Sequence, residues 1–173
     1  MRVVGVDLGT RKASVAQFHI DARGVIRLYD VTTFYVHPAV RPKELATLTT
    51  TMIDACKGAN YVFIEEPLVG RGVKASMQIS QVAGAVMAML GNHGIHTELV
   101  NVKTWKKDIC GNGNASKEDV DMWLSTTHPS YAEACGDDRH RQDNVDACCI
   151  GLFGVATLER ANHGLLEDVR SVP

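Results

Sequence analysis

The stretch VVGVDLGTRKASVA, residues 3–16, decides the fold because it joins two apolar runs through a short turn that starts with a carboxylate. The first run, residues 2–7, is almost continuously apolar, as is typical of a strand in the centre of a sheet. The second run, residues 13–20, predicts a neighbouring strand. The turn DARG at residues 21–24 then predicts a third strand at residues 25–34. These three strands are expected to form an antiparallel meander.

Helices and strands alternate in the rest of the chain. We expect strands at residues 61–65 and 95–101, and helices at residues 42–56, 75–90, 103–110 and 143–160, with one more helix after Ser116 as its N-cap. Residues 128–142 are predicted to be irregular. Strand–helix–strand connections imply right-handed parallel crossovers beside the first strand. The predicted fold is therefore a ribonuclease-H-like α/β domain with a five-stranded mixed sheet flanked by helices. It occupies residues 1–173, with a tail after about residue 161 outside the core.

Composition limits the classes of protein that fit this chain. The chain has 173 residues, of which 45% are hydrophobic and 22% charged, so it fits a single globular domain. No apolar run reaches the length of a membrane span, and the N-terminus lacks the layout of a signal peptide. Five cysteines without zinc-site spacing predict reduced thiols in a cytoplasmic protein. The formal net charge of −2 means that any contact with nucleic acid requires a local basic patch.

Four carboxylates stand where the predicted fold would bring them together. Asp7 and Glu65 end parallel neighbouring strands, whose carboxyl ends lie on the same edge of a sheet. Asp143 and Asp146 share one face at the start of the last helix. Four such groups repel one another unless a cation binds, and carboxylate oxygens suit Mg²⁺ or Mn²⁺. Two such ions are expected, held about 4 Å apart to clamp the oxygens of a phosphodiester.

Other interpretations remain open at this point. Asp143 and Asp146 are also compatible with a solvated first helical turn. The turn DLGT occurs in ATPases of the actin and sugar-kinase class, but 173 residues are too few for their two lobes. A non-catalytic binding module with the same fold is the third possibility, and the intact set of carboxylates argues against it.

Four passages resemble the RuvC-type Holliday junction resolvases of the ribonuclease-H and retroviral-integrase superfamily, enzymes of bacteria or bacteriophages. They are VVGVDLGTRKASVA, VFIEEPLVGRG with ISQVAGAV, VKTWKKDICGNGNASKEDV, and DNVDACCIGLFG. The first turn departs from the family's D-P-G, since Leu8 replaces proline. The resemblance implies a magnesium-dependent endonuclease that cuts four-way DNA junctions as a homodimer and needs no nucleotide cofactor. Forks and flaps remain alternative substrates.

The resemblance also implies roles for individual residues. The catalytic set would be Asp7, Glu65, Asp143, Asp146 and Lys117, with Glu66 as the alternative to Glu65. Basic or apolar residues around the site would contact DNA, and Leu68 would unstack bases at the crossover. The predicted DNA contacts are Leu68, Arg71, Lys74, Lys103, Lys106, Lys107, Arg139 and Arg141. The helix at residues 75–90 would form the dimer interface.

Overall fold

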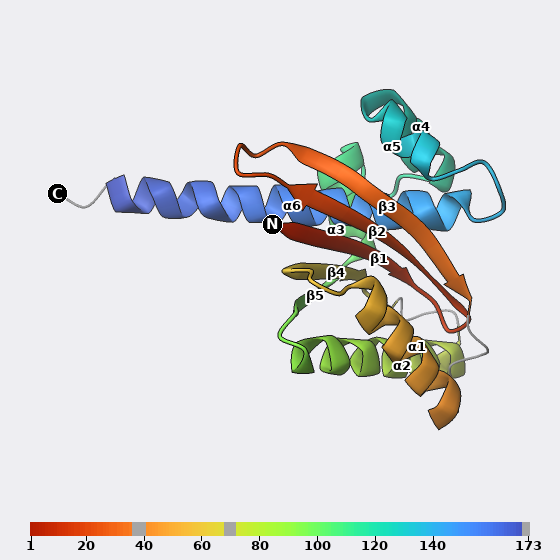
Figure 1. Ribbon diagram of the computed structural model, residues 1–173. Coiled ribbons are helices and arrows are strands. Elements are labelled where there is room, and N and C mark those ends of the chain that lie inside the picture. Colours follow the sequence, from red (N-terminus) through yellow and green to blue (C-terminus); the bar gives the residue numbers. More distant parts are fainter. Residues whose placement is uncertain (36–40, 68–71, 171–173) are drawn as a thin grey trace.

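A mixed five-stranded sheet forms the centre of the molecule (Figure 1). The computed structural model describes residues 1–35, 41–67 and 72–170, and of residues 163–170 only the helical backbone. The strands run in the order β3-β2-β1-β4-β5. Their bounds are Arg2–Leu8 for β1, Lys12–Ile20 for β2, Ile26–Tyr35 for β3, Tyr61–Glu65 for β4 and His96–Val100 for β5. Strands β1, β2 and β3 pair antiparallel, whereas β1–β4 and β4–β5 pair parallel, so the predicted topology is confirmed.

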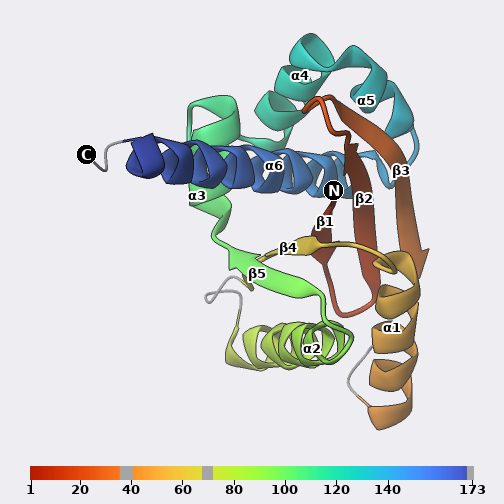
Figure 2. The same cartoon turned by 60° about the vertical axis from the view of Figure 1, so that its left-hand side comes forward.

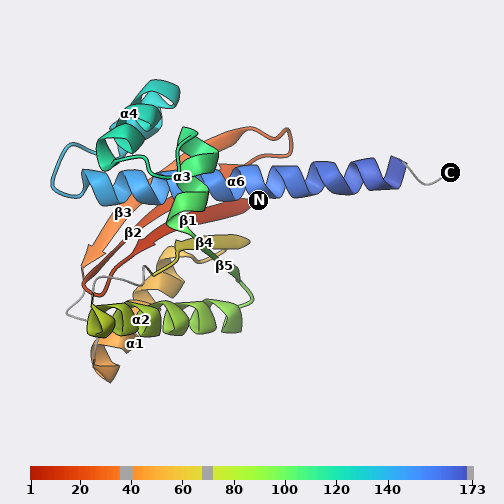
Figure 3. The ribbon, with the colours of Figure 1, turned by 180° about the vertical axis from the view of Figure 1, so that it is seen from behind.

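Helices cover both faces of this sheet (Figure 3). One face carries α1 (Pro42–Ala55) and α2 (Val73–Asn92), and the other carries α6 (Arg141–Arg170) with α3 (Val102–Cys110), α4 (Lys117–Thr127) and α5 (Pro129–Ala134) around it. Each face has its own hydrophobic core. Val3 packs with Trp105 and Ile150 on the α6 face, and Val4 packs with Leu48 on the other. Strand β1 is buried on both faces, as its continuous apolar run predicted.

Two predictions about the last third of the chain were wrong. Residues 128–142 are not entirely irregular, because Pro129 opens the short helix α5, whose Tyr131 donates its hydroxyl to the Ile26 carbonyl. The final helix begins at Arg141 rather than Asp143, and it continues ten residues beyond the expected end at Arg160. Gly164 is an isolated glycine in this extension, and a single glycine lowers helix propensity without ending a helix.

Three glycines let α6 lie directly against the sheet (Figure 2). A Cβ on Gly5 of β1 would lie 2.2 Å from the Ala147 carbonyl oxygen of α6. A Cβ on Gly151 would lie 2.4 Å from the Phe18 ring, and one on Gly154 would lie 2.2 Å from the Phe63 ring. Real Cβ atoms do not approach their neighbours so closely, so only glycine permits this packing. The close approach sets the start of α6 beside the end of β1.

No helix in the described ranges is both long enough and apolar enough to cross a membrane. All five cysteines are free thiols, and Cys110 is the one that is partly exposed. Burial raises the pKa of the Cys110 thiol above its usual range.

Candidate active site

A cleft of about 550 Å³ opens at the carboxyl ends of β1 and β4, where the start of α6 meets them. Loops after both strands line it, together with the first turns of α2, α3, α4 and α6. Its charged lining residues are Asp7, Glu65, Glu66, Asp143, Asp146, Lys106 and Lys117. The structure therefore brings together the four carboxylates that the sequence pattern singled out, and Lys117 with them.

Each of these carboxylates is held by a different piece of the fold. Asp7 is the second-last residue of β1, and Glu65 is the last of β4, the neighbouring parallel strand. Asp143 and Asp146 lie in the first two turns of α6. The glycine contacts between α6 and β1 keep that helix near enough for all four to share one cleft.

Burial and mutual repulsion raise the pKa values of three of the four groups. Burial raises the pKa of Asp7 to about 7, and the charges of Glu65, Asp146 and Asp143 add to the shift. Burial, then the Glu65 charge, raises the pKa of Asp146 to about 6. Burial also raises the pKa of Glu65. Carboxylates that repel one another in this way form a site that gains from a bound cation.

Glu65 and Glu66 occupy distinct environments. The indole Nε1 of Trp105 donates a hydrogen bond to Glu65 Oε2 at 3.0 Å, and this bond holds the carboxylate at the cleft. Glu66 is exposed and accepts a hydrogen bond from Asn101 Nδ2 at 3.1 Å. The geometry favours Glu65 as the fourth member of the acidic set.

Two lysines on the α3 and α4 side offset part of this negative charge. Lys117 is the first residue of α4. Ser116 is the N-cap of this helix, as predicted, and it forms a capping box with Asp119. Lys106 donates from Nζ to the Ala115 carbonyl oxygen at 2.7 Å. Burial raises the pKa values of Glu65 and Asp146, and both ammonium groups partly oppose this rise.

A third lysine was missed by the sequence analysis. Lys12, the first residue of β2, forms an ion pair with Asp143 Oδ2. No local pattern in the sequence indicates this pair, because it joins residues 131 positions apart. The one feature of the sequence that could have indicated a role for Lys12 is its position just after the turn that follows Asp7.

The remaining residues predicted to contact DNA lie in several places. Lys74 is exposed in the first turn of α2, beside the cleft. Lys103 and Lys107 line a separate groove between α3 and α6, next to the ion pair of Arg160 with Asp108. Leu68 and Arg71 lie outside the described residues.

The two arginines before α6 differ in their contacts. Arg139 is exposed and lies over the Tyr35 ring, 5.5 Å from its centroid. Arg141 Nε donates to Asp121 at 2.7 Å, Nη1 donates to the Ala132 and Gly136 carbonyls, and Nη2 donates to Asp121 as well. These contacts engage the donors of Arg141 within the protein, and its contact with DNA stays a prediction.

The donor set of the cleft fits a hard divalent cation, because its acidic ligands are all carboxylate oxygens. In the arrangement observed here, no three His, Cys, Asp or Glu side chains of the described ranges converge closely enough to hold one ion. Asp143 is paired with Lys12 in this arrangement.

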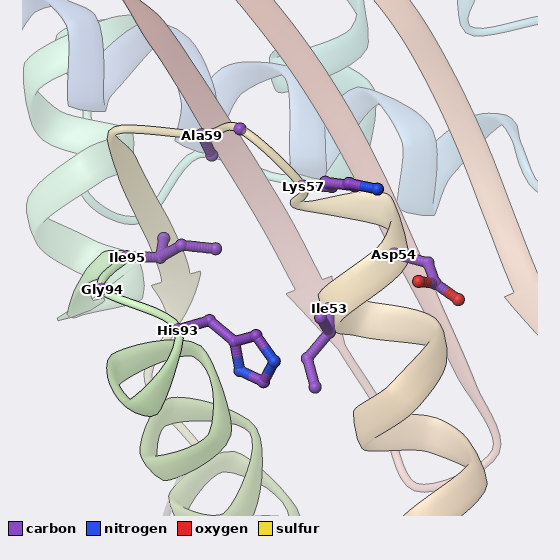
Figure 4. A pocket seen from close by; sticks show the side chains of 8 residues that line it. Ile53, Asp54, Lys57, Ala59, His93, Gly94 and Ile95 are labelled. Carbon is purple, nitrogen blue, oxygen red and sulfur yellow. The ribbon is translucent and has the colours of Figure 1, made fainter.

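Another cavity, of about 380 Å³, lies before the amino ends of β4 and β5, opposite the acidic cleft (Figure 4). His93 and Ile53 face each other across it, whereas Asp54 and Lys57 point away. His93 is the C-cap of α2, and its Nδ1 lies 2.9 Å from the Met89 carbonyl oxygen of that helix. This cavity has no comparable set of converging charges, and the acidic cleft is the candidate active site.

The fold and this cleft together define a nuclease of the ribonuclease-H-like class. The chain belongs to the crossover junction endodeoxyribonuclease RuvC family, whose model matches residues 3–134. It is 27% identical over 159 residues to RuvC of Salinibacter ruber, covering 88% of this chain and 83% of that protein. It is 30% identical over 130 residues to RuvC of Chlorobium phaeovibrioides, covering 73% and 68% of the two chains.

Solved structures show the same fold. Thermus thermophilus RuvC matches with a TM-score of 0.69 at 17% identity, over 91% of this chain and 96% of that one. The yeast mitochondrial Holliday junction resolvase matches with a TM-score of 0.67 at 10% identity, over 93% and 80%. Membership of this nuclease family supports a divalent metal ion as cofactor and does not favour the ATPase alternative.

Proposed function

We propose that this protein is a structure-selective endodeoxyribonuclease that resolves four-way DNA junctions by hydrolysing phosphodiesters with Mg²⁺ or Mn²⁺. The observation that carries the proposal is the cleft in which β1, β4 and α6 gather four carboxylates in a chain of the RuvC family. Two structural relatives support the substrate. Thermus thermophilus RuvC was solved in complex with a Holliday junction substrate, and fowlpox virus resolvase with Holliday junction DNA.

Asp7, Glu65, Asp143 and Asp146 would hold the metal, with two ions per site. Bound there, the ions would stabilise the charge that develops on the phosphate oxygens. The protein's own groups would do the rest. Trp105 fixes Glu65 through its hydrogen bond, and Lys117 offers an ammonium group to the phosphate at the cleft.

Phosphate contacts outside the cleft would position the DNA without reading its sequence. Lys74, Lys103, Lys107 and Arg139 are the candidates, and all four are exposed. Lys106 is closer to the carboxylates and would act within the cleft. These cations offset locally the repulsion between DNA and the acidic site.

A homodimer would suit a symmetric junction, because two matching cuts require two active sites related by a two-fold axis. Helix α2 offers the surface for it. Gly84 and Ala88 are exposed on this helix, as is Met77, whereas Ala83 is buried against its own domain. Small exposed residues allow the close approach of a second helix.

Forked or flapped DNA is the alternative substrate for the same chemistry. A panel of labelled junctions, forks, flaps and linear duplexes at equal concentration distinguishes the two. A junction resolvase should cut the four-way junction with paired symmetric nicks and leave linear duplex intact.

The site itself is tested by replacing carboxylates with amides of the same shape. Asp146→Asn and Glu65→Gln should reduce junction nicking in Mg²⁺ by more than about 100-fold, beyond the loss typical of a residue that only supports a metal ligand. Both should keep or improve junction binding in Ca²⁺, because each removes a negative charge that repels phosphate. The matched control is Glu66→Gln, one residue further along, which should still nick. Normal nicking by Asp146→Asn would disprove the proposed metal site.

A further inference from the structure

The ion pair between Lys12 and Asp143 links β2 to a carboxylate that lines the cleft. The side chain of Lys12 is 40% exposed, and that of Asp143 is 15% exposed. The turn before β2 fixes the lysine's position, because the Gly9 amide donates to the Lys12 carbonyl at 2.8 Å. Lys12 therefore extends from a rigid hairpin toward a helix that the glycine contacts hold in place.

Lys12 neutralises a different carboxylate of the cleft from those that the other two lysines affect. Lys106 and Lys117 come from α3 and α4 and partly oppose the rise that burial causes in the pKa values of Glu65 and Asp146. Lys12 comes from another element, β2, and pairs with Asp143 alone among the described residues. The positive charge beside the acidic set is thus divided between separate elements.

We propose that Lys12 is a displaceable counter-ion, which holds Asp143 when metal is absent and is released when metal binds. This inference rests on the proposed metal site. Asp143 Oδ2 cannot serve an ammonium group and a divalent cation fully at the same time, so metal binding must weaken the ion pair. Lys12 and the metal therefore compete for one ligand.

The released ammonium group would have a partner in the substrate. Lys12 is partly exposed beside Asp143, and a partly exposed lysine pairs readily with a DNA phosphate. Metal binding would thus free a phosphate contact, and DNA binding would remove the competitor of the metal. By linkage, metal and DNA would each increase the affinity for the other.

Thermal melting of the DNA-free protein tests the competition. In EDTA, Lys12→Met should melt at a lower temperature than the parent, because Asp143 loses its counter-charge. On titration with Mn²⁺, the midpoint of stabilisation should move to about threefold to tenfold lower concentration, as expected when a partly exposed ion pair no longer competes. Lys12→Arg keeps the cation and should retain the parent midpoint within about twofold.

The matched control is Arg11→Met, which removes the same charge one residue away. Arg11 is exposed and makes no ion pair within the described ranges. This variant should leave the Mn²⁺ midpoint unchanged. A second control is the double variant with Asp143→Asn. In that background, Lys12→Met should no longer change the melting temperature in EDTA, because the partner is gone.

Junction binding supplies an independent measurement. The factor by which Ca²⁺ improves the junction Kd should be about threefold smaller in Lys12→Met than in the parent, the loss of about one phosphate contact.

The outcomes separate the two proposals. If Mn²⁺ stabilises the parent and Lys12→Met shows an unchanged or higher midpoint, the counter-ion is disproved and the metal site stands. If no divalent ion stabilises the parent, both proposals fail.

Discussion

Asp7 is a single residue whose ionised carboxylate is unfavourable in the folded, metal-free protein. It is the second-last residue of a strand that is buried on both faces, and four other carboxylates line the same cleft. Its pKa is raised to about 7 from an ordinary 3.8. An acid with a higher pKa in the folded state binds its proton more tightly when folded. Its contribution to stability is therefore largest at low pH and is lost as pH rises from about 4 to about 7.

This shift predicts a pH-dependent gain in stability for Asp7→Asn in metal-free protein. At pH 8 the variant should melt roughly 5–10 °C above the parent, because no buried carboxylate has to ionise. The difference should shrink as the pH falls and vanish near pH 4. Thermal melts in EDTA across this range measure it. Asp54→Asn, at an exposed carboxylate of α1, is the matched control and should leave the pH profile unchanged. Equal melting of Asp7→Asn and the parent at pH 8 would contradict the pKa shift.

The acidic residues could be found from the sequence and Lys12 could not, for a physical reason. Asp7 and Glu65 each follow a short apolar run, so strand periodicity alone places them at one edge of a parallel pair. The partner of Lys12 depends on the register of β2 and on the distance between α6 and the sheet. That distance is set by contacts between side chains and glycines far apart in the chain.

Among the elements, α6 has the greatest influence on the site, since its docking places two of the four carboxylates. Gly154→Ala should therefore damage the enzyme from a position outside the cleft. The added methyl would meet the buried Phe63 ring, and overpacking of this kind costs about 1–3 kcal/mol. We expect a lower urea midpoint together with slower junction nicking in Mg²⁺.

The control for this prediction is Gly91→Ala in α2, where an added Cβ meets no atom within 4 Å. Alanine favours helix over glycine, so this variant should be neutral or slightly more stable and fully active. If Gly154→Ala behaves like Gly91→Ala, the close docking of α6 does not limit the site.

The elements that sequence reasoning missed are those that depend on tertiary contacts. The strands and the four longer helices up to residue 127 follow from periodicity and capping signals such as Ser116. Helix α5 has only six residues, too few for periodicity, and it is held by contacts such as that of Tyr131 with β3. The polar composition after Arg160 predicts a tail, whereas α6 continues to Arg170.

At the scale of the whole molecule, the acidic cleft lies at the carboxyl ends of β1 and β4, and α2 exposes the small residues Gly84 and Ala88. If this side of α2 is the dimer interface, Ala88→Arg should place a large charged group inside it. We expect a single-chain mass by light scattering at micromolar concentration, where the parent has twice that mass.

The same variant should change the products. On a plasmid with an extruded cruciform, the parent should give linear DNA through paired cuts, and Ala88→Arg should give mainly single nicks. Met122→Arg, on the exposed side of α4, adds the same charge elsewhere and should remain dimeric. A dimeric Ala88→Arg would move the interface away from α2.

The glycines that seat α6 also constrain how this sequence can change over generations. Every substitution at Gly151 or Gly154 adds at least a Cβ that would clash with a phenylalanine ring, so no single substitution at either position is neutral. A change there can persist only if the facing ring shrinks as well, Phe18 for Gly151 and Phe63 for Gly154. Related lineages should therefore exchange these residues in pairs, with a bulkier helix residue accompanied by a smaller strand residue. The spacing of the active site is inherited through such pairs, without any change in the carboxylates themselves.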